Sequence, residues 1–197
     1  MSRGARTRPS TLVGAWVGNG LVTNLGDYES IATTTVGSGG VAEIDFTSIP
    51  STYKHLQVRA LVRTNRASTR DGVYIYINNT RTTTSYTTHV LTGDGATAAS
   101  GGYDSASGVG AQTVVVLGNS VASQMFAVVV LDILDYANTN KNKTIRAIGG
   151  FDYNGGGELG IASNAFLSST AINRITFDPA NGTGFMEYSS FALYGIK

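Results

Sequence analysis

The chain has 197 residues, enough for one domain with a core that needs no cross-link. It has no cysteine, which excludes a disulfide scaffold, a Cys-ligated zinc site and a thiol nucleophile. Charged residues make up only 14% of the chain, and 14 basic side chains nearly cancel 13 acidic ones. With 42% hydrophobic residues, 25 glycines and no apolar run of membrane-spanning length, the composition predicts a neutral soluble domain and names no function.

The first 26 residues have the character of an extended arm ahead of the folded domain. They contain no acidic residue, and strand-like alternation starts only after them. Arg3, Arg6 and Arg8 precede an apolar stretch, as in a signal peptide, but glycines interrupt that stretch too often for an apolar helix. We therefore predict an arm over residues 1–26 and one folded domain over residues 27–197.

From residue 28 onward the chain shows the two-residue alternation of half-buried β-strands. The clearest case begins at Leu56, where Leu56, Val58 and Ala60 alternate with polar or charged side chains. The same strand is expected to direct His55, Gln57, Arg59 and Arg63 toward its polar face. The other predicted strands span residues 28–36, 41–46, 72–78, 85–91, 112–117, 124–134, 143–151, 171–177 and 187–196.

Two segments depart from simple alternation. Residues 125–134 are apolar on both faces, which predicts a central strand covered on two sides. We therefore expect Val128 and Val130 to be buried, so that an aspartate at either position would abolish folding. Residues 93–110 are rich in Gly, Ala and Ser without periodicity and are predicted to form a long exposed loop or an interface loop.

These elements define the fold class. About ten short strands, separated by Gly, Asn, Ser and Thr turns, contain many β-branched and aromatic residues. No segment carries a sustained 3.6-residue apolar stripe. The sequence predicts an all-β protein, an antiparallel two-sheet β-sandwich with jelly-roll-like topology, preceded by the arm.

Motifs for catalysis are weak. There are two histidines, His55 and His89, and no G-x-S-x-G elbow, so no hydrolase triad is predicted. The stretch 93–98 resembles a phosphate-binding loop in outline, but no helix pattern follows it. Residues 152–158 and 135–140 carry oxygen side chains around turns, loosely like calcium loops, although Asp, Asn and Gly are also typical of ordinary turns. We predict no enzyme activity, cofactor or metal, and the sequence leaves calcium at these two turns open.

Arginine is concentrated in one strand and the loop after it, at Arg59, Arg63, Arg66 and Arg70. A nucleic-acid surface would need a surplus of positive charge, whereas the chain has a formal net charge of only +1. Arginine also favours bidentate pairing across protein interfaces. We therefore predict that these four arginines bind a protein partner.

The arm carries a second predicted contact set, made of Arg3, Arg6, Arg8 and Trp16. A lone tryptophan in a Gly-rich segment is a large apolar surface that favours burial against something else. The three arginines suit an acidic groove on a neighbouring protein. We predict that the arm grips such a neighbour, and a merely solvated tail is the alternative.

Three separated segments resemble a module found in small virion proteins of tailed bacteriophages, especially marine and cyanobacterial ones. They are Tyr28–Arg63 (YESIATTTVGSGGVAEIDFTSIPSTYKHLQVRALVR), Leu131–Glu158 (LDILDYANTNKNKTIRAIGGFDYNGGGE) and Tyr188–Lys197 (YSSFALYGIK). The resemblance covers nearly everything from Tyr28 onward and leaves the arm outside. It implies a jelly-roll-like sandwich on the virion surface with no known catalytic residues, and it leaves open whether the protein sits on the head or the tail.

The expected function follows from this resemblance and from the arm. A tail fibre needs a shaft to project its receptor-binding end, which 26 irregular residues do not supply, whereas a decoration protein needs a globule and a grip on the shell. We expect a capsid decoration (cement) protein, a homotrimer bound to the major capsid protein or another virion protein. A tail-tip or fibre-type receptor-binding protein, with a host-surface glycan as partner, is the alternative. A lectin or glycan depolymerase is a more distant one.

Overall fold

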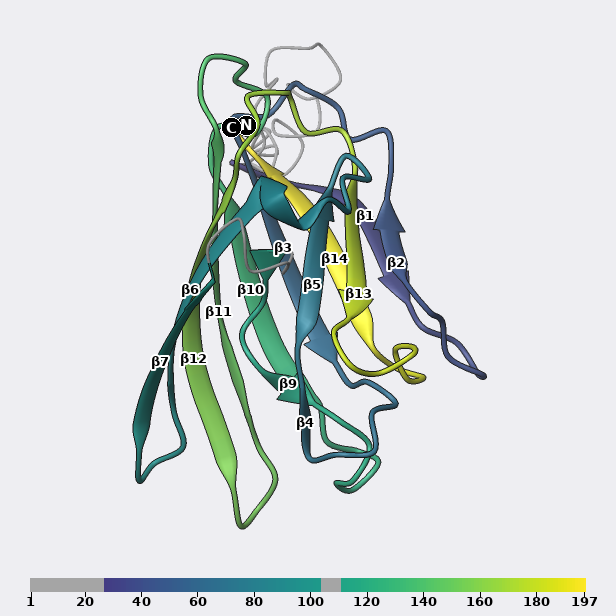
Figure 1. Cartoon of the computed structure of the whole chain (residues 1–197). Coiled ribbons are helices and arrows are strands. Elements are labelled where there is room, and N and C mark those ends of the chain that lie inside the picture. The colour runs from purple at the N-terminus through teal and green to yellow at the C-terminus, as the bar shows by residue number, and fades with distance from the viewer. Residues whose placement is uncertain (1–26, 104–110) are drawn as a thin grey trace, which may run out of the picture.

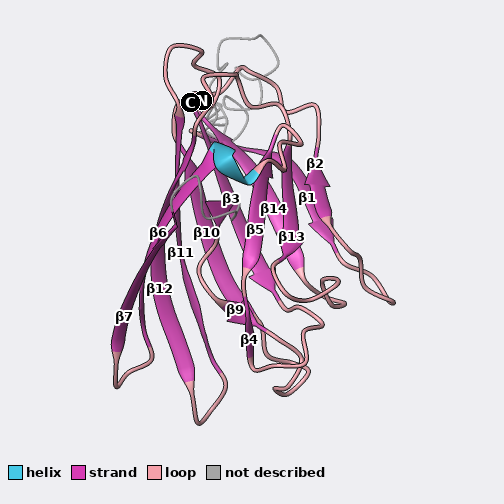
Figure 2. Ribbon diagram, viewed as in Figure 1, coloured by secondary structure: helices cyan, strands magenta, loops and turns pink. Residues whose placement is uncertain are grey.

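The computed structural model describes residues 27–103 and 111–197, and these form an all-β protein with one short 3-10 turn, Thr83–Ser85 (Figures 1 and 2). Two antiparallel sheets pack together, which confirms the predicted sandwich. The larger sheet has eight strands, in the spatial order β1 (Tyr28–Thr35), β14 (Ser190–Ile196), β3 (His55–Val62), β10 (Ala127–Ile133), β11 (Lys143–Asp152), β12 (Gly157–Phe166), β6 (Tyr86–Gly93) and β7 (Ala98–Tyr103).

The smaller sheet has four strands, in the order β2 (Ile44–Phe46), β13 (Ile175–Pro179), β5 (Val73–Ile77) and β8 (Ala111–Gln112). A two-stranded ribbon pairs β4 (Arg70–Asp71) with β9 (Val116–Leu117). The chain passes repeatedly between the sheets, since β1, β3 and β14 belong to the larger one and β2, β5 and β13 to the smaller. The strands β10, β11 and β12 instead follow one another as neighbours in a meander.

The core lies between the two sheets and follows from the alternation of each strand. In β3, Leu56, Val58 and Val62 are buried, as the sequence predicts. In β5 the pattern is equally regular, because three aliphatic residues point inward and Tyr74 and Tyr76 point outward. Phe177 of the smaller sheet meets Phe191 of the larger one with ring centroids 5.1 Å apart, which ties the layers together.

Most buried polar side-chain atoms of the described residues have hydrogen-bond partners, and Nε of Arg63 is the exception. The hydroxyl of Tyr86, a fully buried residue, donates to the Thr80 carbonyl at 2.8 Å and accepts from the Ile77 amide at 2.9 Å. Burial raises the pKa of Tyr86 to about 12. The Lys143 ammonium donates to the backbone carbonyls of Asn138, Lys141 and Ser169, so this buried lysine is held by oxygen atoms without a carboxylate.

The structure corrects the prediction for residues 93–110. Part of this segment, β7, pairs with β6 as the edge of the larger sheet instead of forming a loop. Its side chains before Tyr103 are small and carry little β propensity, but the backbone ladder with β6 needs none. Gly102 fits close to the His89 ring, where a Cβ would lie only 2.8 Å from an imidazole carbon. Residues 104–110 lie outside the described residues.

The second correction concerns the outer face of β10. This strand is central in its sheet, with β3 on one side and β11 on the other, as the sequence predicts. However, Val128 is 51% exposed, so the prediction that it is buried is wrong, and Val130 is only partly buried. The reason is tertiary: the smaller sheet covers one face of the larger sheet, and no second layer of described residues covers the other.

Candidate interaction surface

The four arginines that the sequence groups together have different environments. Arg59 lies on the outer face of the larger sheet, with its guanidinium carbon 5.4 Å from the Tyr194 ring centroid and 5.6 Å from that of Tyr28. Its Nε donates to Oε1 of Gln57 at 2.8 Å. Two aromatic faces and one amide therefore fix an exposed cation in a single position.

Arg63 is buried, although the sequence places it on the polar face of its strand. The residue is 2% exposed, because the loop from Asn119 to Met125 covers its side chain. Its guanidinium donates to the carbonyl of Val121 at 2.7 Å and to that of Ala122. Burial lowers the pKa of Arg63. The guanidinium is engaged inside its own chain and stabilises this loop.

Arg66 and Arg70 lie in the connection between β3 and β5 and are paired with carboxylates of the same chain. Arg66 approaches the buried Asp71 at 3.7 Å and donates to the Arg70 carbonyl at 3.1 Å. Arg70 forms a 2.9 Å ion pair with Glu158 on β12. Both remain partly exposed, so a partner could reach them, but the structure does not join them to Arg59 in one patch. Arg3, Arg6, Arg8 and Trp16 lie outside the described residues.

In the two turns that resemble calcium loops in sequence, the aspartates make hydrogen bonds and an ion pair within the chain. The Asp152 carboxylate accepts the Asn154 amide at 2.8 Å, which closes the β11–β12 turn. Asp135 pairs with Lys141, while its backbone amide donates to Nδ1 of His55 at 3.0 Å. No group of three or more potential metal-ligating His, Cys, Asp or Glu residues occurs within residues 27–103 and 111–197. In the same ranges no helix is long and apolar enough to cross a membrane.

The most distinctive exposed feature is the outer face of the larger sheet. Seven aliphatic side chains there form what we call the apolar patch, and six of them are between 41% and 65% exposed. The patch crosses five neighbouring strands, from β3 through β10, β11 and β12 to β6. Its members are Leu61, Leu91, Val128, Val130, Ile148, Leu159 and Ile161.

Strand register arranges the apolar patch in two rows. Val130 pairs with Ile148, Ile148 with Ile161, and Ile161 with Leu91, which gives one continuous row across four strands. In the second row, one pleat further along, Leu61 lies opposite Val128, and Leu159 stands between two glycines. Because residues two apart on a strand share a face, both rows point outward together.

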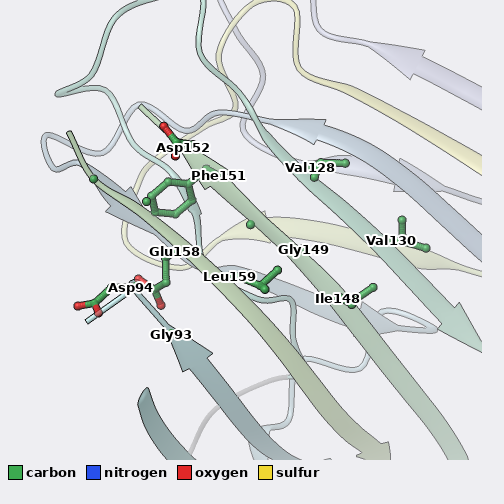
Figure 3. Close-up of a pocket in the computed structure, with 14 residues that line it drawn as sticks. Gly93, Asp94, Val128, Val130, Ile148, Gly149, Phe151, Asp152, Glu158 and Leu159 are labelled. Atoms are coloured by element: carbon green, nitrogen blue, oxygen red, sulfur yellow. The ribbon is translucent and has the colours of Figure 1, made fainter. Parts of the chain in front are cut away.

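A groove with a volume of about 760 Å³ lies over the lower part of this patch (Figure 3). Val128, Val130, Ile148 and Leu159 line it, and Gly149 and Gly150 provide its floor where β11 has no side chain. The groove is open to solvent along the sheet. It ends toward the β6–β7 and β11–β12 turns, at the lower edge of the molecule in Figure 1.

The two ends of the outer face, along the strand direction, carry different polar and charged groups. At the lower end Asp94 and Asp152 border the groove, and neither forms an ion pair within the described part of the chain. Backbone amides of Thr97 and Ala96 donate to the Asp94 carboxylate and hold its pKa below the usual value. This carboxylate therefore stays ionised at neutral pH.

The other end, which we call the polar half, contains a chain of hydrogen bonds across β3, β10 and β11. Oε1 of Gln57 accepts a hydrogen bond from Nε of Arg59, and Nε2 of Gln57 donates one to Asp132 at 2.8 Å. Arg146 donates to the second oxygen of Asp132, also at 2.8 Å. Burial alone would raise the pKa of Asp132, but the hydrogen bonds from Arg146 and Gln57 outweigh it and keep this pKa low.

The apolar patch is a feature that the predicted elements did not include, although the sequence contains a signal for it. Apolar residues on both faces of residues 125–134 fit either a doubly covered strand or a strand with one uncovered apolar face. The companion signals are Ile148, Leu159, Ile161 and Leu91 on the outward positions of three other strands. No protein-family model matches this chain, and a search of curated proteins finds no match.

Proposed function

We propose that this protein is a non-enzymatic structural protein of a tailed-phage virion, most specifically a capsid decoration protein on the virion surface. The observation that carries the proposal is the apolar patch, which lies on a rigid sheet and is bordered by charge. A continuous apolar surface of this kind is typical of a protein that assembles with others. The resemblance of three segments to small phage virion proteins supplies the virion setting.

In this proposal the two parts of the chain have separate tasks. Residues 1–26 grip the major capsid protein or another virion protein through Arg3, Arg6, Arg8 and Trp16. Ordering such an arm costs conformational entropy, which a buried tryptophan and charge-paired arginines offset. The sandwich provides the contacts among copies of the chain. Arg66 and Arg70, which stay partly exposed, are available to a neighbouring virion subunit.

Cosedimentation of the purified protein with stripped capsids tests the proposal. The intact chain is expected to sediment with capsids, and changing Arg3, Arg6 and Arg8 together to Ser is expected to release it. Binding should also weaken with salt, because exposed ion pairs are screened beyond about 8 Å at physiological ionic strength. Counting copies per virion adds a second measure, since a decoration protein is present in hundreds of copies and a tail part in about a dozen or fewer.

A second function, a receptor-binding protein of the phage tail, is favoured by a specific feature of the polar half. Tyr28 is 50% exposed beside Arg59, and the carboxylate of Asp132 is linked to Arg59 through the buried Gln57. Aromatic rings beside polar groups suit the apolar faces and hydroxyls of sugars. Host cells included as a competing target separate the two functions: tight, arm-independent binding to cells and none to capsids would replace the decoration proposal with the receptor-binding one.

A further inference from the structure

The outer face of the larger sheet is large enough to form the centre of a stable contact. Six half-exposed aliphatic side chains together expose roughly 500 Å² of apolar surface, which is in the upper part of the size range of the largest patch on a monomer, a patch that is often functional. A standard interface buries about 800 Å² on each partner, with an apolar centre and a polar rim. The charged groups that border the apolar patch supply a rim of that kind.

The order of residues along β11 makes this face complementary to itself. Arg146, Ile148, Gly150 and Asp152 occupy successive outward positions, so a cation and a carboxylate stand at opposite ends of the same apolar stretch. Consider a two-fold axis that lies between the two sheets, perpendicular to the strands and level with Gly149. This axis makes the two β11 strands run in opposite directions. It would bring Asp152 of one copy opposite Arg146 of the other, twice in the same contact.

The apolar rows obey the same symmetry. Relative to the level of Gly149, the row that contains Ile148 and Ile161 lies on the side of the polar half. The row that contains Val128 and Leu159 lies on the opposite side, toward Asp94 and Asp152. Reversal places each row over the other row of the second copy, so apolar side chains meet on β10 and β12, whereas Leu61 on β3 meets Arg59. Two sheets can pack in this way about 10 Å apart.

We infer that the outer face of the eight-stranded sheet binds a second copy of this chain, as an isologous pair centred on β11. The inference rests on the proposed self-association of the protein and specifies its surface, its symmetry and its partner. A pair replaces the trimer expected from the sequence. The partner is a second copy because the face carries opposite charges at its two ends: the polar half has Arg59 and Arg146 with one carboxylate, Asp132, and the other end has Asp94 and Asp152.

Sedimentation velocity of the full chain, from about 1 to 100 µM, measures the association directly. The expected result is a reversible monomer–dimer equilibrium. Leu159→Asp places a charge at the most exposed position of the apolar patch and should abolish the dimer while circular dichroism stays unchanged. Leu167→Asp is the matched control, since Leu167 is 44% exposed but follows the end of β12 and lies outside the patch.

A charge exchange tests the symmetry itself. Asp152→Arg should weaken the dimer by about tenfold, because two arginines then oppose each other across the contact. Combining Asp152→Arg with Arg146→Asp, in an Asp132→Asn background that removes the carboxylate bound to Arg146 within the chain, should restore it. Recovery in the double variant is specific to a contact in which these two positions face each other between copies.

Several outcomes would overturn the inference. These are a full chain that stays monomeric at 100 µM, a trimer, a dimer that survives Leu159→Asp, and a charge exchange without recovery. A chain shortened to residues 27–197 that dimerises when the full chain does not would show that the N-terminal segment covers this face instead. These measurements use the purified protein without capsids, so their failure is distinguishable from failure of the proposed virion function.

Discussion

Two faces of one strand illustrate how this molecule is built. Along β10, Ala127, Val129, Leu131 and Ile133 point into the sandwich and are at most 3% exposed. Val128, between two of them, is 51% exposed on the opposite face. The outer face is also aliphatic at Val128 and Val130, so hydrophobicity does not distinguish the two faces over this part of the strand. The inner face is apolar because the smaller sheet covers it, and the outer face is apolar without cover from any described residue, which indicates a surface for association.

The largest expected effect separates these faces with adjacent residues. Val129→Asp buries an unpaired carboxylate and should lower the free energy of unfolding by more than about 4 kcal/mol, enough to prevent folding. Val128→Asp should change it by no more than about 1 kcal/mol, because the new carboxylate stays hydrated. Thermal melts followed by circular dichroism measure both. Similar losses in the two variants would mean that the outer face is covered within the monomer.

A second comparison contrasts two arginines of the same segment. Arg63→Ala leaves a loop's carbonyl groups without their buried donor and should cost about 3 kcal/mol in urea unfolding. Arg59→Ala removes an exposed cation held by two tyrosines and should cost about 1 kcal/mol or less. If the order of the two losses is reversed, the outer face contributes more to the monomer than its exposure implies.

The polar half gives a smaller, pH-dependent effect. Asp132 has a lowered pKa in the folded state, so its contribution is present above the unfolded value of about 3.9 and is lost as pH falls through the folded value. Asp132→Asn should therefore be about 1 kcal/mol less stable than the parent at pH 7, with the difference shrinking toward pH 2. Urea midpoints at the two pH values measure it. A gap that stays constant with pH would exclude an ionic role for Asp132.

The smallest expected effect comes from removing the arm. All strands of the described fold lie between Tyr28 and Ile196, so a chain shortened to residues 27–197 should keep its β-type circular dichroism and a cooperative melt. Its melting temperature should lie within a few degrees of the parent's. An insoluble or non-cooperative product would mean that the first 26 residues are part of the core.

The sequence by itself determined the all-β class, the existence of most strands and their inward faces. Alternation with a period of two is a local property, and Leu56, Val58, Val73 and Ile75 are buried where that alternation places them. Turn residues mark several strand ends, but the predicted strand 112–117 forms two short strands, β8 and β9, that belong to different sheets. The edge strand β7 was missed because its small residues contribute backbone hydrogen bonds and little side-chain pattern.

Only the tertiary structure decided what covers each face. The number of layers over β10, the loop folded around Arg63 and the alignment of Ile148, Ile161 and Leu91 into one row depend on contacts between residues far apart in the chain. Periodicity reports which residues share a face, and it contains no information about what lies across from that face. The same limit applies to the arginines: four basic residues within twelve positions became one exposed cation, one buried cation and two paired ones because packing places each of them independently.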